Sequence, residues 1–239
     1  MSLTAYDGLL GRRSAALGVA LGAIVFLVML GTDDVVSTHA GRLGRLAALS
    51  PLAGAAGTLI AVAQARSRGE LRALGAAGIA PFRASLGGIW GGTLVGLLGA
   101  MLAIAPGVDL SPLFPRALPT EGGWVRDGAS WLDTARGVRV AIDGAVSWAD
   151  ARADLRPVGA APFGATLTAL VLAAIAFPVW ATAPGTMLRR AAVCFGVASA
   201  AVFVFHLVAA QRTSSMFLVL PPLILLADAW MLHRGRAWS

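Results

Sequence analysis

The residues best suited to a specific charged contact lie in one short polar stretch between two long apolar runs. Glu70 has an arginine two residues away on either side, Arg68 and Arg72, and Leu71 and Leu74 add larger apolar side chains. The stretch is too polar to cross a bilayer, and it is suited to lie at a membrane surface as a short helix. The chemistry open to these side chains is ion pairing and docking.

The same stretch has the boundaries of a helix. Gly78 and Pro81 predict that a helix within residues 66–83 ends there. A rigid cytoplasmic helix between two membrane spans can transmit the movement of a docked soluble protein into those spans. An ordinary interfacial loop is the competing interpretation, and the residues by themselves do not separate the two.

Groups for bond-making chemistry are sparse. His39, His206 and His233 are far apart in the sequence, and Cys194 is the single cysteine and lies in an apolar run. The sequence contains no Walker-type motif, so ATP hydrolysis by that route would need a separate subunit. We therefore expect neither a catalytic set nor a bound cofactor in this chain.

Composition identifies the environment of the elements that position Glu70. Hydrophobic residues make up 57% of the 239 residues and charged residues only 13%, against about 25% charged residues in soluble domains. The sequence predicts an all-α integral membrane protein with six transmembrane helices, in two groups of three. The expected spans are 15–31, 46–65, 84–105, 163–183, 191–210 and 216–232.

The two groups of spans flank a polar insert. We expect residues 1–105 to hold the first three spans, with the short helix at about 66–83 between the second and third. Residues 106–160 form the insert, and residues 161–239 form the last three spans. Alternation along residues 138–144, which end in an Asp-Gly pair, predicts short strands and a turn in the insert.

Glycines recur every four residues in the third span. Such spacing places small residues on one helix face and lets neighbouring helices approach closely. The residues are Gly87 and Gly91 in one row and Gly88, Gly92 and Gly96 in another. We interpret them as packing residues.

Arginine supplies all the positive charge, and its distribution predicts the topology. Ten arginines flank one set of span ends, namely Arg12, Arg13, Arg66, Arg68, Arg72, Arg83, Arg189, Arg190, Arg234 and Arg236. The short loops on the other side carry Arg42, Arg45 and Arg212. By the positive-inside rule both termini are cytoplasmic, the insert is extracytoplasmic, and the membrane is the bacterial inner membrane. This placement at span ends disfavours nucleic-acid binding.

The three arginines of the outer side are candidates for contact with an anionic lipid headgroup. Simple anchoring of helix ends is the competing interpretation for Arg42, Arg45 and Arg212.

The polar stretch also carries a resemblance. Residues 69–83 read GELRALGAAGIAPFR and resemble the coupling helix of the LptF/LptG permease family, whose pattern is approximately S-E-L-x-A-x-x-A-x-G-[IV]-S followed by a span. The matching residues are Glu70, Leu71, Ala73, Ala76, Gly78 and Ile79. Gly69 and Ala80 depart from the pattern. The related FtsX/MacB-type permeases have four spans and a much larger extracytoplasmic domain, and they fit less well.

The resemblance implies a lipid exporter. Members of the family pair with a homologous or identical permease on a cytoplasmic ABC ATPase dimer, which holds the ATP and Mg. They move lipopolysaccharide, an anionic glycolipid, through a periplasmic jellyroll towards a bridge protein. By carry-over, Glu70 would contact the ATPase, with Arg68, Arg72, Leu71, Leu74 and Gly78 around it, and Arg83 would anchor the helix end.

Two departures leave a second interpretation open. The insert is less than half as long as the periplasmic domain of the family, and Asp33 and Asp34 stand where the family tends to present Lys. The alternative is a non-transporting membrane scaffold or assembly subunit that kept the permease fold.

Overall fold

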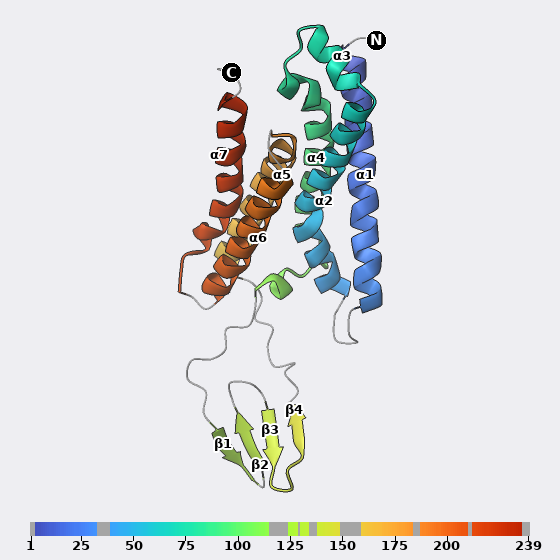
Figure 1. Ribbon diagram of the computed structural model, residues 1–239. Helices are drawn as coiled ribbons and strands as arrows, with labels where there is room; N and C mark the ends of the chain where they lie inside the picture. Colours follow the sequence, from blue (N-terminus) through green and yellow to red (C-terminus); the bar gives the residue numbers. More distant parts are fainter. Residues whose placement is uncertain are drawn as a thin grey trace.

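The helices lie side by side in one bundle (Figure 1). The structure, a computed structural model, describes residues 3–32, 39–114, 124–128, 130–133, 138–148, 159–183, 187–209 and 212–235. α1 begins and α7 ends at one end of the bundle, the end at which helix α3 lies, and a small sheet lies beyond the other end. We refer to these as the α3 end and the sheet end.

The order of elements follows the predicted arrangement of spans around an insert. The helices of the first half are α1 (Leu3–Thr32), α2 (His39–Ser67), α3 (Glu70–Ala76) and α4 (Pro81–Ala103), followed by the 3-10 turn η1 (Ser111–Leu113). The helices of the second half are α5 (Ala160–Thr182), α6 (Met187–Ala209) and α7 (Leu220–Gly235), with the 3-10 turn η2 (Ser215–Val219) before α7.

Five stretches within the described residues are helical, long and apolar enough to cross a bilayer. They are Leu3–Gly31, His39–Ser67, Pro81–Ala103, Ala160–Thr182 and Ser215–His233. In α6 the described apolar part is Phe195–Ala209 and is shorter than these five. The predicted helical, multi-pass membrane protein is confirmed to this extent, whereas the sixth span stays a prediction.

The first two helices begin earlier than their apolar runs. α1 starts at Leu3 rather than at residue 15, and α2 starts at His39 rather than at residue 46. Backbone hydrogen bonding continues a helix through polar residues whenever a neighbouring helix packs against them. Apolar content therefore located the membrane part of each helix and not its start.

Small residues bring α1, α2 and α4 into close contact, as the glycine rows predict. A Cβ atom placed on Gly91 would meet the carbonyl oxygen of Gly11 in α1, and one placed on Gly92 would meet Thr58 and Gly54 in α2. The row that contains Gly91 faces α1, while the row that contains Gly92 faces α2 and, at Gly96, also meets Ala174 of α5. This packing confirms the interpretation of the glycines.

Buried hydroxyl groups join the same three helices. Thr58 Oγ1 is 3.1 Å from Ser14 Oγ and donates to the carbonyl oxygens of Gly54, at 3.0 Å, and Gly88, at 3.1 Å. Ser14 and Thr58 are both fully buried. Polar groups in an apolar interior are tolerated when they are hydrogen-bonded. These hydrogen bonds help to fix how α1, α2 and α4 are oriented relative to one another.

The second half of α1 has little contact with the rest of the bundle. Val19, Ile24, Leu27 and Val28 are each more than half exposed, and a Cβ atom on Gly22 would meet nothing within 4 Å. α1 is therefore held mainly through its first half, while its second half presents apolar side chains outward.

Short strands form in the insert, as predicted. β1 (Trp124–Asp127), β2 (Ser130–Asp133), β3 (Val138–Ala141) and β4 (Val146–Trp148) pair in sequence order as an antiparallel meander. Gly144, with φ of +83°, and Asp143 form the turn between β3 and β4. Much of the predicted insert, including residues 115–123 and 149–158, lies outside the described residues.

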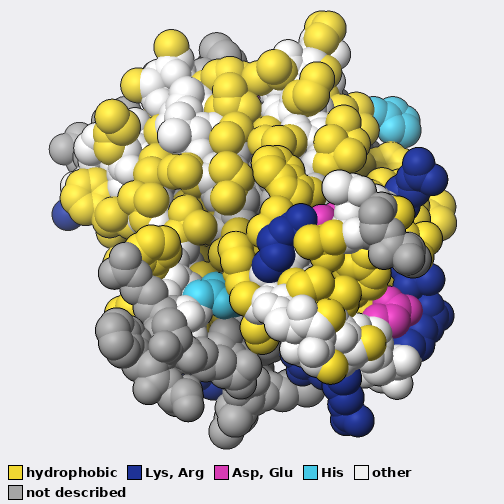
Figure 2. All heavy atoms as spheres, turned by 90° about the horizontal axis from the view of Figure 1, so that it is seen from above, with side chains coloured by type: hydrophobic (Ala, Val, Ile, Leu, Met, Phe, Trp, Pro, Cys, Tyr) yellow, Lys and Arg dark blue, Asp and Glu magenta, His cyan; other side chains and the backbone are white. Residues whose placement is uncertain are grey.

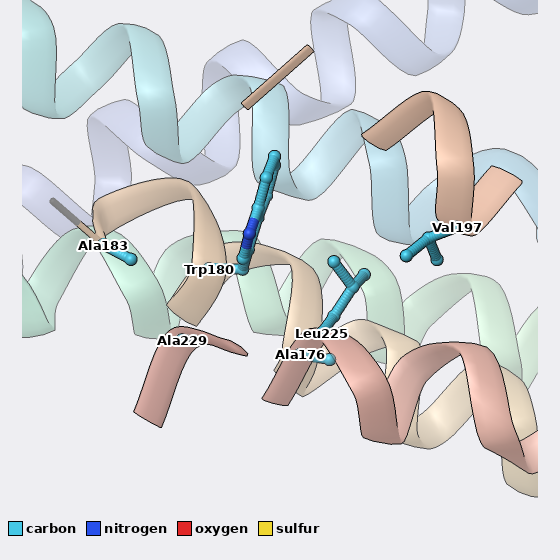
Figure 3. Close-up of a cluster of buried hydrophobic side chains, with 6 residues drawn as sticks. All are labelled: Ala176, Trp180, Ala183, Val197, Leu225 and Ala229. Atoms are coloured by element: carbon cyan, nitrogen blue, oxygen red, sulfur yellow. The ribbon is translucent and has the colours of Figure 1, made fainter. Parts of the chain in front are cut away.

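α5, α6 and α7 meet in a separate apolar cluster. Its buried members are Ala176, Trp180, Ala183, Val197, Leu225 and Ala229. Figure 3 shows Leu225 of α7 between Trp180 of α5 and Val197 of α6. α6 packs along α7 and η2, so its position depends on α7.

Candidate functional site

The helix α3 lies at the end of the bundle, and two glycines delimit it. Gly69 precedes Glu70 with φ of +77°, and Gly78 follows the helix with φ of +79°. The N–H of Ile79 donates to the carbonyl oxygen of Leu74 at 3.0 Å, which is the closure of a Schellman motif. Gly78 therefore acts by ending the helix, and a side chain in its place would be strained.

The apolar face of α3 turns towards the bundle. Leu71 and Leu74 are partly buried and pack against a buried cluster that includes Tyr6 and Leu10 of α1 and Ala65 of α2. These leucines were predicted as part of a docking surface. The structure instead uses them to attach α3 to α1 and α2.

Glu70 also faces the bundle. Its Oε1 accepts from Arg13 of α1 at 3.4 Å and lies 3.9 Å from Arg68. The Glu70 side chain is 27% exposed, and its Oε2 atom is buried without a hydrogen-bond partner in the described part of the chain. Of the two predicted flanking arginines, only Arg68 lies near the carboxylate.

Arg13 is the residue of this site that the sequence analysis did not single out. It had been counted as one of the charges that set topology. The ion pair joins residues 57 positions apart, a separation that no sequence spacing reveals. Its neighbour Arg12 is exposed, so adjacent arginines at this end have different surroundings.

A second ion pair ties the start of α4 to α1. Arg83 Nη1 donates to Asp7 Oδ2 at 2.7 Å, and the Asp7 side chain is only 21% exposed. Arg83 was expected to anchor the end of the short helix at lipid headgroups, and the structure gives it a protein partner. The first turns of α1 thus bind both α3 and the beginning of α4 through opposite charges.

The outward face of α3 carries small residues and one arginine. Arg72, Ala73 and Ala76 are exposed, as are Arg66 in the last turn of α2 and Arg68 in the turn before α3. Figure 2 views the molecule from this end and shows groups of Arg side chains in dark blue, with acidic side chains in magenta directly beside some of them. The surface open to a docking protein therefore carries small side chains and a positive charge.

Charge also links α6 to α7 near the α3 end. Asp228 of α7 accepts from Arg189 of α6 at 2.6 Å and from the indole N–H of Trp180 in α5 at 3.1 Å. The Asp228 side chain is 16% exposed. One carboxylate therefore joins three helices, in a region otherwise held by apolar contacts.

The candidate headgroup arginines occupy the sheet end. Arg42 and Arg45 lie in the first turns of α2 and are partly buried, and Arg212 is exposed just before η2. Arg42 and Arg45 each make contacts within the chain. Asp33 and Asp34 lie outside the described residues. The structure therefore places these arginines at the end of the bundle opposite α3.

The described residues contain no candidate metal site. Among them, His, Cys, Asp and Glu residues do not gather in any group of three or more. No family model matches this chain, and no curated protein matches it. The geometry at the α3 end is accordingly the basis for any statement about function.

Proposed function

We propose that the chain is the membrane subunit of an ABC transporter that exports a lipid, driven by a separate cytoplasmic ATPase. The observation that carries the proposal is the attachment of α3: a short helix at the end of the bundle, bound to α1 by the Glu70–Arg13 ion pair and packed on α1 and α2 through two leucines. A force applied to α3 would reach α1 through the Glu70–Arg13 pair and reach α1 and α2 through the packed leucines.

The proposed topology has six spans with both termini in the cytoplasm. α1 begins and α7 ends at the α3 end (Figure 1), which supports an even number of crossings. α6 has 23 residues and is therefore about 35 Å long at 1.5 Å per residue, which is sufficient for a bilayer of about 30 Å. The arginine-rich α3 end is then cytoplasmic in an inner membrane.

The substrate that we propose is lipopolysaccharide or a related anionic glycolipid, handled together with a second, homologous or identical permease subunit. The outward apolar side chains of α1 support a lipid-facing or partner-facing role for that helix. Arg42, Arg45 and Arg212 at the sheet end would meet the anionic headgroup. A periplasmic bridge protein would receive the lipid.

A non-transporting scaffold is the second candidate, and the sheet favours it. The strands of the meander have three or four residues each, and Trp131 and Val146 are 47% and 60% exposed. Such a sheet does not enclose an acyl chain by itself. Lipid-stimulated ATP hydrolysis in reconstituted proteoliposomes would support the exporter, and hydrolysis indifferent to lipid would support the scaffold.

The first prediction concerns the outward face of α3. Replacing Ala73 by Trp should reduce the amount of ATPase that co-purifies with the detergent-solubilised chain by about tenfold, since a bulky side chain at a close contact costs about 1–3 kcal/mol. The measurement is mass spectrometry of the purified complex, with the ATPase identified by its peptides.

Ala63→Trp supplies the matched control. Ala63 is exposed on α2 near the same end, so the same change in size occurs away from α3. Wild type and Ala63→Trp should retain the ATPase equally. Absence of any ABC ATPase from the wild-type preparation, even after mild cross-linking, would contradict the proposed function.

A further inference from the structure

The carboxylates at the α3 end are already occupied by arginines of the same chain. Asp7, Glu70 and Asp228 lie 2.7, 3.4 and 2.6 Å from Arg83, Arg13 and Arg189, respectively. Each of these pairs joins two different helices. None of the three carboxylates is therefore presented outward as a free negative charge for a docking protein.

Positive charge at this end is in excess. Arg12, Arg66 and Arg72 are exposed, and none of them forms an ion pair within the residues that the structure describes. Arg68 is 54% exposed and lies at the outer limit of ion-pair distance from Glu70. A protein that covers α3 consequently meets Arg72 and Arg68 before it meets Glu70.

The orientation of α3 favours a protein partner over the membrane surface. A helix that rests on lipid turns its large apolar side chains into the bilayer. α3 instead turns Leu71 and Leu74 onto α1 and α2 and exposes Ala73 and Ala76. Small exposed residues permit the close approach that a groove on another protein requires, whereas they offer little to acyl chains.

We infer that the soluble partner docks on α3 with acidic side chains, which pair with Arg72 and Arg68, while Glu70 acts inside the chain as the anchor that joins α3 to α1. This inference rests on the proposed function and specifies the chemistry of its interface. Complementary charge at an interface chiefly raises the association rate and the selectivity for the partner. The inference therefore predicts that the partner groove is acidic.

Charge reversal at one residue tests the inference. The full-length chain is reconstituted in nanodiscs, and its affinity for the ATPase that co-purifies with wild type is measured by biolayer interferometry. Arg72→Glu should weaken that affinity at least about tenfold, because like charges at an interface cost several kcal/mol. Arg72→Gln, which adds no repulsion, should weaken it less.

Two variants at the same end serve as controls. Arg12→Glu makes the identical change at an exposed arginine of α1 rather than on α3 and should alter the affinity by no more than about twofold, since a charge outside the direct contact is screened by salt. Glu70→Gln should likewise keep the partner bound, and it should lower the extent to which binding stimulates ATP hydrolysis, because the anchor to Arg13 is weakened.

The outcomes separate the inference from the proposed function. A wild-type chain that binds no ATPase overturns both. If the wild type binds but Arg72→Glu binds equally well, or if Glu70→Gln alone loses binding, the inference is wrong and the proposed function stands. Equal losses for Arg72→Glu and Arg12→Glu would show nonspecific attraction of the arginine-rich end to anionic surfaces, which also overturns the inference.

Discussion

Gly54→Ala should lower the free energy of unfolding of the chain by at least about 2 kcal/mol, the scale of overpacking in a filled interior. A Cβ atom on Gly54 would overlap the carbonyl oxygen of Gly92 and lie 3.1 Å from its carbonyl carbon. The obstacle is backbone on a neighbouring helix, so no side-chain rotation relieves it. α2 and α4 must then separate, and the hydrogen bond from Thr58 to the carbonyl oxygen of Gly88 must lengthen.

The measurement is SDS-titrated unfolding in mixed micelles, followed by circular dichroism. Gly22→Ala is the matched control, since a Cβ atom there meets nothing within 4 Å. Alanine has a higher helix propensity than glycine by about 1 kcal/mol, so the control should be neutral or slightly stabilising. Equal midpoints for the two variants would show that the glycine contacts between α2 and α4 are not as close as the structure has them.

Asp228→Asn should loosen the beginning of α6. The change removes the charge that pairs with Arg189, while an amide oxygen can still accept from Trp180. The Arg189 side chain is 43% exposed, so solvent screens the pair and the loss is about 1 kcal/mol rather than the value of a buried pair. Because α6 packs along α7 and η2, this loss falls on the contact that joins the beginning of α6 to α7.

Hydrogen–deuterium exchange in nanodiscs reads the effect directly. Amides of the first turns of α6 should exchange about fivefold to tenfold faster in the variant, since about 1.4 kcal/mol corresponds to tenfold. Asp7→Asn is the control, because it breaks the comparable pair with Arg83 at the other side of the bundle. Its faster exchange should appear at the start of α1 and α4. Unchanged exchange in α6 for Asp228→Asn would mean that apolar packing alone holds that helix.

Periodic features of the sequence predicted much of the fold. The glycine rows of α4 identified a closely packed helix, and the contacts of Gly91 and Gly92 with α1 and α2 confirm this. Alternation in residues 138–144 identified β3, which ends at Ala141 before the Asp-Gly turn. These features repeat every two or four residues. Such local repeats are visible in the sequence without knowledge of the fold.

The side-chain contacts of the candidate site were predicted less well. The Glu70–Arg13, Arg83–Asp7 and Arg189–Asp228 pairs join residues 57, 76 and 39 positions apart. The direction of α3 decides which residues face outward, and a seven-residue helix is too short for its apolar positions to fix that direction. Ion pairs between residues far apart in sequence, and the face that α3 turns outward, are set only when the helices pack together.

The uneven attachment of α1 has a consequence for how the protein is handled outside its native bilayer. The side chains of Val19, Ile24, Leu27 and Val28 that face outward must be solvated by acyl chains, and the free energy of that half-helix is set by the amphiphile around it. Short-chain detergents solvate such a surface less completely than a bilayer does. The first half of α1 would then stay fixed while the second half frays, so acyl-chain length becomes a variable that controls the shape of the molecule.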